Sequence, residues 1–407
     1  MQTIRCAAGA ARHRPRLFIL ESLIALAGRI SIVAAFSAWL GASAATNSIG
    51  LVTNRGFDYV HESVPSVPWS IHVLKVDRSH HELEFHTTLG KGRIAGMGTV
   101  SEQVKFLGAR FGNPVAAVNG DFYENSPAFP GDPEGLQIAD GELVSAPSSQ
   151  KVCFWMDSDG NPFRSNVVSK FHVTWPDGSL TPLGLNETRS AASAVLYTAA
   201  VGRSTRSSEG GVEVVLESAG SGRWLPLEIG QNYMARVESI RRGADTAIAT
   251  NAMVLSIGPD VSSPVLNLKV GDTLQISTAT SPDLKGIQTA IGGGPTLVTR
   301  GKAHQWQGFE LRHPRTAIGW NQQYFFMVVV DGRQRGLSAG MTFSELASYM
   351  AKIGCIEAMN LDGGGSATLW LVGAAANSPS EGRERPAANA LVVVQKQRHG
   401  ESHGNPR

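Results

Sequence analysis

The stretch RTAIGWNQQYFFMVVVDGR, residues 315–333, contains two apolar runs separated by a short polar turn near Asn321 and Gln322. Apolar runs of this length bounded by turn residues are typical of β-strands. The polar residues Asp331 and Arg333 follow the second run directly. The stretch therefore predicts a pair of strands that ends in polar side chains.

The rest of the chain from Trp69 onward repeats this pattern of short apolar or alternating runs between Gly, Pro, Asn and Asp. Further strands are predicted at residues 71–76, 115–118, 212–216, 273–277, 367–372 and 390–394. The predicted fold class is α+β: a strand-rich single domain with mixed sheets and few helices, whose active site lies at strand ends.

Only two segments have convincing helical signals. Residues 100–109 follow Thr99, and Glu102 stands three positions later, as in a capping box. Residues 343–353 follow Thr342 with Glu345 in the same relationship, and Gly354 occupies the position after the last turn. Both segments are predicted as capped helices.

The N-terminus combines basic residues, an apolar region and the small residues Ala42, Ser43 and Ala44. This order is typical of a secretory signal peptide, which we predict for residues 1–44, with an uncleaved signal anchor as the alternative. A linker at 45–68, a catalytic domain at 69–394 and a disordered tail at 395–407 complete the predicted organisation. The protein is expected to be extracytoplasmic, either periplasmic or secreted, without a stable membrane span once the peptide is cleaved.

Composition limits the classes of function. The chain has 407 residues, of which 42% are hydrophobic and 17% charged, enough for a large core. Removal of residues 1–44 leaves 31 basic and 33 acidic residues without a basic run, so nucleic acid is not expected as a partner. Cys153 and Cys355 then remain as either a disulfide or two buried thiols.

Four polar clusters stand at the ends of predicted strands, where open sheets bind their ligands. The first is Asn119-Gly120-Asp121, which is also compatible with a plain hairpin turn. The second is the run 292–294 of three glycines, whose amides can approach an anion. The third contains Arg315 and Arg333, which can clamp a phosphate or simply be solvated.

The fourth cluster is the loop Asn360-Leu361-Asp362-Gly363-Gly364-Gly365-Ser366 between two predicted strands. Adjacent glycines lose extra conformational entropy on folding, so their use suggests that something approaches this backbone closely. A glycine-rich hairpin without function is the alternative.

Taken in order, these clusters resemble the phosphodiester glycosidase family, with the loop 360–366 as the most specific motif and a match from about residue 69 to residue 394. Asp121 departs from the family pattern, in which many members have Gly. The resemblance implies hydrolysis of a sugar 1-phosphodiester, releasing free sugar and a phosphomonoester, on envelope or exopolysaccharide glycans. The expected partner is a sugar phosphodiester or envelope glycan.

The resemblance also assigns roles. Arg315 with the Gly293 and Gly294 amides would hold the phosphate, Asp362 would be the nucleophile, base or electrostatic stabiliser, and Asn119, Asp121 and Asn360 would hold sugar hydroxyls. The expected catalytic residues are Asp362, Arg315 and Asp121. The expected substrate-binding residues are Asn119, Gly293, Gly294, Thr316, Asp331, Arg333, Ser338, Glu345, Asn360, Gly363, Gly364 and Ser366.

Two of these roles have structural alternatives. As a capping-box residue Glu345 has a complete structural role, which we favour, and Ser338 either binds phosphate or begins the turn before the helix.

No cofactor is expected, although a divalent cation is compatible with the sequence. The alternative enzyme is a metal-assisted phosphodiesterase that gathers Asp121, Asp331 and Asp362 around the ion and attacks phosphorus. A non-catalytic polysaccharide-binding protein is the alternative from another class.

Overall fold

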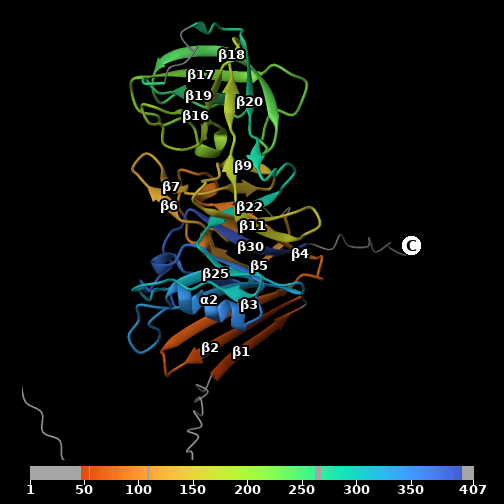
Figure 1. Ribbon diagram of the computed structural model, residues 1–407, viewed down its shortest axis with the longest axis vertical. Helices are drawn as coiled ribbons and strands as arrows, with labels where there is room; N and C mark the ends of the chain where they lie inside the picture. Colours follow the sequence, from red (N-terminus) through yellow and green to blue (C-terminus); the bar gives the residue numbers. More distant parts are fainter. Residues whose placement is uncertain (1–46, 55, 108–110, 262–266, 397–407) are drawn as a thin grey trace, which may run out of the picture. The chain divides into compact units, whose positions relative to one another are not determined.

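The computed structural model describes residues 47–54, 56–107, 111–261 and 267–396, all within the compact unit Ala44–Arg407 (Figure 1). The predicted signal peptide and most of the predicted tail lie outside the described residues. The described chain is rich in strands and has two α-helices, which confirms the predicted strand-rich fold class. Of the described strand pairs, only β15 with β16 is parallel.

An eight-stranded sheet contains the stretch quoted at the outset. Its order is β1 (Asn47–Asn54), β2 (Phe57–Val64), β3 (Trp69–Asp77), β26 (Tyr324–Val330), β25 (Arg315–Trp320), β27 (Glu357–Asn360), β23 (Thr296–Thr299) and β24 (Lys302–Ala303). Strand β26 is apolar throughout because both its faces are covered: Phe325 and Met327 enter one core, Phe326 and Val328 another.

A five-stranded sheet packs on one face of the first. Its order is β29 (Ala374–Ala375), β28 (Leu369–Leu371), β5 (Asn113–Asn119), β30 (Asn389–Gln395) and β4 (Leu83–Leu89). Leu391 and Val393 of β30 share a core with Ile318 and Met327 of the first sheet, whereas Val392 faces the opposite way. The two sheets therefore form a sandwich in which β25 and β5 approach each other.

The helices cover the outer faces of this sandwich. Helix α2 (Phe343–Lys352) packs its buried Leu346 and Met350 on the eight-stranded sheet, and α1 (Val100–Phe106) packs Val100 and Val104 on the five-stranded sheet. The two predicted capping boxes are confirmed at Thr99 with Glu102 and at Thr342 with Glu345. Neither described helix is long and apolar enough to cross a membrane.

Two further large sheets share a core that includes Trp155 and Leu255. The smaller has the order β11 (Pro162–Asn166), β10 (Val152–Met156), β22 (Thr289–Gly293), β8 (Gln137–Ala139) and β9 (Glu142–Ser145). The larger has the order β14 (Leu180–Pro182), β13 (His172–Thr174), β20 (Thr273–Ser277), β18 (Asn232–Gly243), β17 (Gly211–Ser218), β19 (Met253–Ile257), β16 (Ala194–Tyr197) and β15 (Gly184–Leu185). Two-stranded pairs are formed by β12 (Val168–Ser169) with β21 (Thr280–Ser281) and β6 (Tyr123–Asn125) with β7 (Pro130–Pro133).

The structure differs from the sequence-based expectation in two places and decides between two alternatives in a third. The expected linker 45–68 contains β1 and β2, because the buried Phe57 and Tyr59 alternate with polar residues and β2 pairs with β3. The expected strand 367–372 is shortened to β28. Of the two alternatives for the cysteines, the structure has free, buried thiols, which lie in separate cores.

Candidate active site

The glycine-rich loop joins the two sheets of the sandwich. It leaves the eight-stranded sheet at the end of β27, continues as a short 3₁₀ turn (Gly364–Ser366) and enters the five-stranded sheet at β28. The end of β22 lies beside it, since the Gly294 amide donates to the Asn360 carbonyl at 2.7 Å. Three sheets therefore meet at this loop.

Asn119, at the end of β5, holds the loop to both sheets. Its Nδ2 donates to the carbonyl of Asp362 at 2.7 Å. Its Oδ1 accepts from Thr316 Oγ1 at 2.7 Å and from the Thr368 amide at 3.1 Å. The side chain is fully buried. The structure thus gives Asn119 and Thr316 a positioning function in the site.

Each glycine of the loop is in close contact with another part of this chain, which leaves little or no space for a Cβ atom. A Cβ on Gly363 would lie 2.6 Å from the Pro314 carbonyl oxygen, and one on Gly364, whose φ is +60°, would lie 3.2 Å from both terminal nitrogens of Arg333. A Cβ on Gly365 would overlap Glu381 and crowd Arg385. The close approach expected from the glycines is therefore made, in this structure, by the Pro314 carbonyl, Arg333, Arg385 and Glu381.

Asp362 is the carboxylate that the loop presents, with 15% of its side chain exposed. Burial raises its pKa, whereas hydrogen bonds from Ser366 and the Gly363 amide and the charge of Arg385 lower it. Arg385 Nη2 lies 3.8 Å from Asp362 Oδ2 and donates to Ser366 Oγ at 2.7 Å. Arg385 carries no motif signal in the sequence, and folding alone brings it to the loop.

Asp121 lies next to Asp362 through the backbone, because the Asp362 amide donates to the Gly120 carbonyl at 2.9 Å. Its side chain is only 1% exposed and packs against Gly292, which has no room for a Cβ there. Burial raises the pKa of Asp121 to about 7, with Lys151 opposing the shift. Asp121 therefore lies behind the surface of the site.

Glu134 and Lys151 complete the charges around the two aspartates, and sequence reasoning missed both. They form an ion pair with each other. Glu134 precedes Gly135, whose Cβ position lies 2.9 Å from Asp121 Oδ2, and the charge of Glu134 raises the pKa of both Asp121 and Asp362. The site thus contains three carboxyl groups with Lys151 and Arg385 as the facing cations.

Arg315 does not point at this carboxylate group. Alternation along β25 sends Thr316 toward Asn119 and Arg315 toward α2, where its guanidinium stacks on Phe343 at 3.9 Å. Its Nε donates to the Met341 carbonyl and its Nη2 to that of Leu311. Burial lowers its pKa to about 10. These contacts give Arg315 a structural role in place of the expected phosphate clamp.

Arg333 lies beside the glycine-rich loop, and its expected role in phosphate binding stays a prediction. It is exposed, has a φ of +59° and covers Gly364, while its Nη2 lies 3.2 Å from Nδ1 of His313. Arg333 and Arg385 therefore stand on either side of the loop.

The glycine run at the end of β22 is used for packing. Gly293 is buried against the Asn360 carbonyl and Leu361, and the Gly294 amide is bonded to Asn360. The anion nest expected at these amides is therefore wrong for Gly294. Asn360 Nδ2 donates to the Gly294 carbonyl at 2.9 Å and also to that of Leu361, while its buried Oδ1 has no partner among the described residues.

Asp331 and Ser338 belong to a buried network behind Arg333. Asp331 accepts hydrogen bonds from Ser70, His72, Asn377 and the Ser378 amide. These bonds lower its pKa in spite of burial, which acts in the opposite direction. Ser338 donates to the Asp331 carbonyl at 2.6 Å. Both side chains are saturated by the protein, so the structure gives them positioning roles.

Glu345 caps α2, as favoured from the sequence. Its side chain accepts a hydrogen bond from the Thr342 amide at 2.9 Å and forms an ion pair with Arg312.

The alternative metal site receives no support from the geometry. The Asp331 carboxylate is occupied by the hydrogen bonds described above, and the described residues contain no group of three or more His, Cys, Asp or Glu that could hold a metal ion.

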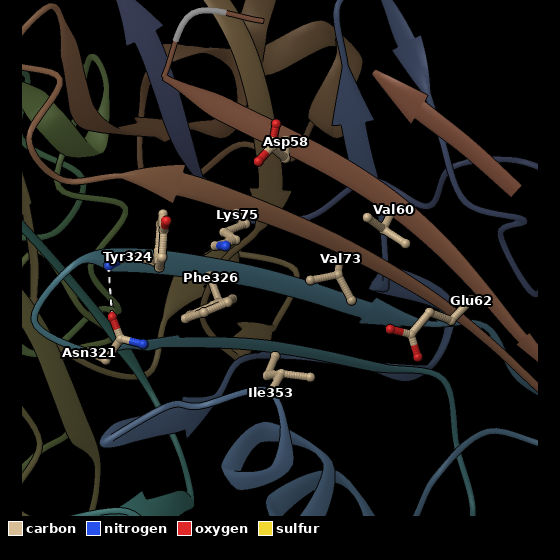
Figure 2. Close-up of a pocket in the computed structure, with 9 residues that line it drawn as sticks. All are labelled: Asp58, Val60, Glu62, Val73, Lys75, Asn321, Tyr324, Phe326 and Ile353. Carbon is tan, nitrogen blue, oxygen red and sulfur yellow. Dashed lines mark hydrogen bonds between the residues drawn. The ribbon is translucent and has the colours of Figure 1, made fainter. Parts of the chain in front are cut away.

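A separate cavity of about 390 Å³ lies on the eight-stranded sheet beside the end of α2. Figure 2 shows Lys75 beside Tyr324, whose ring centroid is 3.6 Å from Nζ, and the Tyr324 amide bonded to the Asn321 side chain. None of the expected site residues lines this cavity.

Part of the chain matches a known family. Residues 230–394 match the family model described as phosphodiester glycosidase. The predicted resemblance is confirmed over these residues. The phosphodiester glycosidase region contains Asp362, Arg333 and Arg385, whereas Asn119 and Asp121 precede it. An uncharacterized SPbeta prophage-derived protein of Bacillus subtilis, YomE, is 33% identical over 115 residues, which are 27% of this chain and only 18% of that protein.

Solved structures show the same fold over most of the chain. A hypothetical protein from Synechocystis superposes with a TM-score of 0.69 at 17% identity, covering 86% of this chain and 64% of that one. A Burkholderia pseudomallei protein described as exported superposes with a TM-score of 0.65 at 22% identity, covering 82% and 74%. The fold of the phosphodiester glycosidase region and of the strands preceding it is thus shared with bacterial proteins of low sequence identity.

Proposed function

We propose that this protein hydrolyses a sugar 1-phosphodiester at the glycosidic bond, with Asp362 as the reacting carboxylate. The observation that supports this most is the partly exposed Asp362, held on a glycine-rich loop between two arginines within a region that matches the phosphodiester glycosidase family. A carboxylate stabilises the positive charge that develops on the sugar, and the arginines stabilise the negative charge of the departing phosphate.

The reaction balances without a strong general acid. The bond between C1 of the sugar and the bridging oxygen breaks, and both electrons leave with the phosphate. A water oxygen forms the new bond to C1, and its proton is taken up by Asp362 or by solvent. The released phosphomonoester carries more negative charge than the diester, because its second ionisation has a pKa near ~6. Asp121 and Glu134 adjust the charge around Asp362 without needing to touch the sugar.

We place this activity outside the cytoplasm, on an envelope or exopolysaccharide glycan. The N-terminal sequence supports export, and a similar fold occurs in a Burkholderia protein described as exported. The sugar and the group on the other side of the phosphate are to be found by screening purified protein against UDP-sugars and other sugar phosphodiesters.

Oxygen-18 water tests the reaction. Label in the released sugar supports cleavage at C1, and label in the phosphate shows attack at phosphorus. Asp362→Asn is expected to lower turnover at least ~100-fold, as for the loss of a main stabilising group. Asp159→Asn, at an exposed position, is the matched control. Turnover by Asp362→Asn at the wild-type rate, or binding of a glycan without product from any substrate, would contradict the proposal.

A further inference from the structure

We infer that Arg385 is the anion receptor of this site and that Glu381 is an internal counter-ion, which an incoming phosphate group displaces. The inference rests on the proposed function for the identity of the substrate. It concerns the segment 376–388 between β29 and β30, called here the strap.

Arg385 has the contacts of a receptor. Its Nη2 donates to Ser366 Oγ at 2.7 Å, and the same nitrogen is 3.8 Å from Asp362 Oδ2. Its Nε is buried and has no hydrogen-bond partner among the described residues. About a third of the side chain, 35%, stays exposed. Its Nη1 faces Glu381 at 3.6 Å, so displacement of Glu381 would leave Nη1 beside Nη2 as a pair of donors for the oxygens of a phosphate group.

Glu381 already places an anion beside these donors. Its Oε1 is 3.6 Å from Arg385 Nη1 and packs so closely on Gly365 that a Cβ there would overlap it. Glu381 is the more exposed partner, at 47%, and the ion pair is its only recorded polar contact among the described residues. The absence of a side chain on Gly365 leaves room for an oxyanion, and the Glu381 carboxylate lies there in this structure.

The strap is anchored on both sides of Glu381, at Ser378 and at Glu384, so Arg385 next to the second anchor is held while the Glu381 side chain can leave. Before it, the Ser378 amide donates to Asp331 Oδ1 at 2.9 Å and Asn377 donates to the same oxygen. After Glu381, the carboxylate of Glu384 accepts hydrogen bonds from the amide and hydroxyl of Ser101 at the start of α1. Between these two anchors, only Glu381, Gly382 and Arg383 are exposed.

Substitution of Arg385 and substitution of Glu381 are expected to change the affinity for phosphate in opposite directions. Merely structural roles for the two side chains would not produce this difference. Titration calorimetry with inorganic phosphate on the full chain is the measurement. Arg385→Gln is expected to weaken binding at least ~10-fold, as for the loss of a charge-assisted hydrogen bond. Glu381→Gln is expected to tighten it about two- to fivefold, the range for release from an exposed ion pair.

Arg383→Gln and Glu238→Gln control for the change in net charge, since both side chains are exposed. They should bind phosphate as the wild type does, and Asp362→Asn should bind at least as well. A wild-type affinity for phosphate in Arg385→Gln would contradict the role of Arg385 as the anion receptor. A weaker affinity for phosphate in Glu381→Gln would contradict the role of Glu381 as the displaced counter-ion. Phosphate affinity is measured without any catalytic turnover. If the affinities change as expected but no phosphodiester is hydrolysed, the proposed function is wrong and the inference about Arg385 and Glu381 stands.

Discussion

Asn119 Nδ2 donates a hydrogen bond of 2.7 Å to the carbonyl of Asp362, so a residue at the end of one strand fixes the backbone of the proposed reacting carboxylate 243 positions later. The same side chain accepts from Thr316 in β25 of the eight-stranded sheet and from the Thr368 amide, which directly precedes β28 of the five-stranded sheet. A single amide therefore determines how the loop sits between the sheets.

Replacement of Asn119 by Ala should destabilise the protein and impair the site together. The change leaves the Asp362 carbonyl, the Thr316 hydroxyl and the Thr368 amide without their partner, and each buried unsatisfied group costs about 1–3 kcal/mol. Chemical denaturation and turnover measure the two effects. Thr316→Val, which removes one of the three bonds, should lose less of both. Wild-type stability in Asn119→Ala would contradict the conclusion that the Asn119 side chain holds the loop in place between the two sheets.

Asp121 should make stability depend on pH. Its pKa is raised to about 7 by burial, so between about pH 4 and 7 the folded state binds more protons than the unfolded state. The contribution of Asp121 to the free energy of unfolding therefore falls as pH rises through this window and is constant above it. Urea denaturation should show wild type losing stability relative to Asp121→Asn from pH 4 to 7. If the free energies of unfolding of the two proteins change in parallel from pH 4 to 7, the raised pKa of Asp121 is wrong.

Gly363 should not tolerate a side chain. A Cβ there would lie 2.6 Å from the Pro314 carbonyl, so Gly363→Ala must move backbone, at a cost of about 1–3 kcal/mol. Displacement of the next residue, Gly364, from Arg333 should also lower turnover. Gly222→Ala is the control, because no atom lies within 4 Å of its Cβ position. Equal melting temperatures for the two variants would show that the loop can adapt.

Glu345 should matter for stability and not for chemistry. Glu345→Gln keeps a capping-box residue but removes the charge that pairs with Arg312, so we expect a loss of at most ~1 kcal/mol and unchanged turnover. Glu345→Ala, which also removes the cap, should melt lower. A large fall in turnover for Glu345→Gln without a change in stability would instead restore the expected substrate-binding role.

The sequence by itself determined the elements and the position of the loop. Strand β20 was predicted with its observed bounds and both helices were predicted with their caps, although α1 ends at Phe106, because apolar periodicity and capping chemistry are local. The motif around Asp362 was equally visible, since adjacent glycines are conspicuous in any chain. Phe57 and Tyr59 lie in the segment predicted as a linker, and the structure shows that they belong to strand β2, which pairs with β3.

Only the tertiary structure decided which side chains surround the loop. Arg315 and Thr316 are neighbours in sequence, yet strand alternation sends one to α2 and the other to Asn119. Arg385 and Glu134 have no local signal, and they reach Asp362 because the strap and the region around β7 pack there. Such proximity depends on strand register and on contacts between distant segments, which local propensity does not encode.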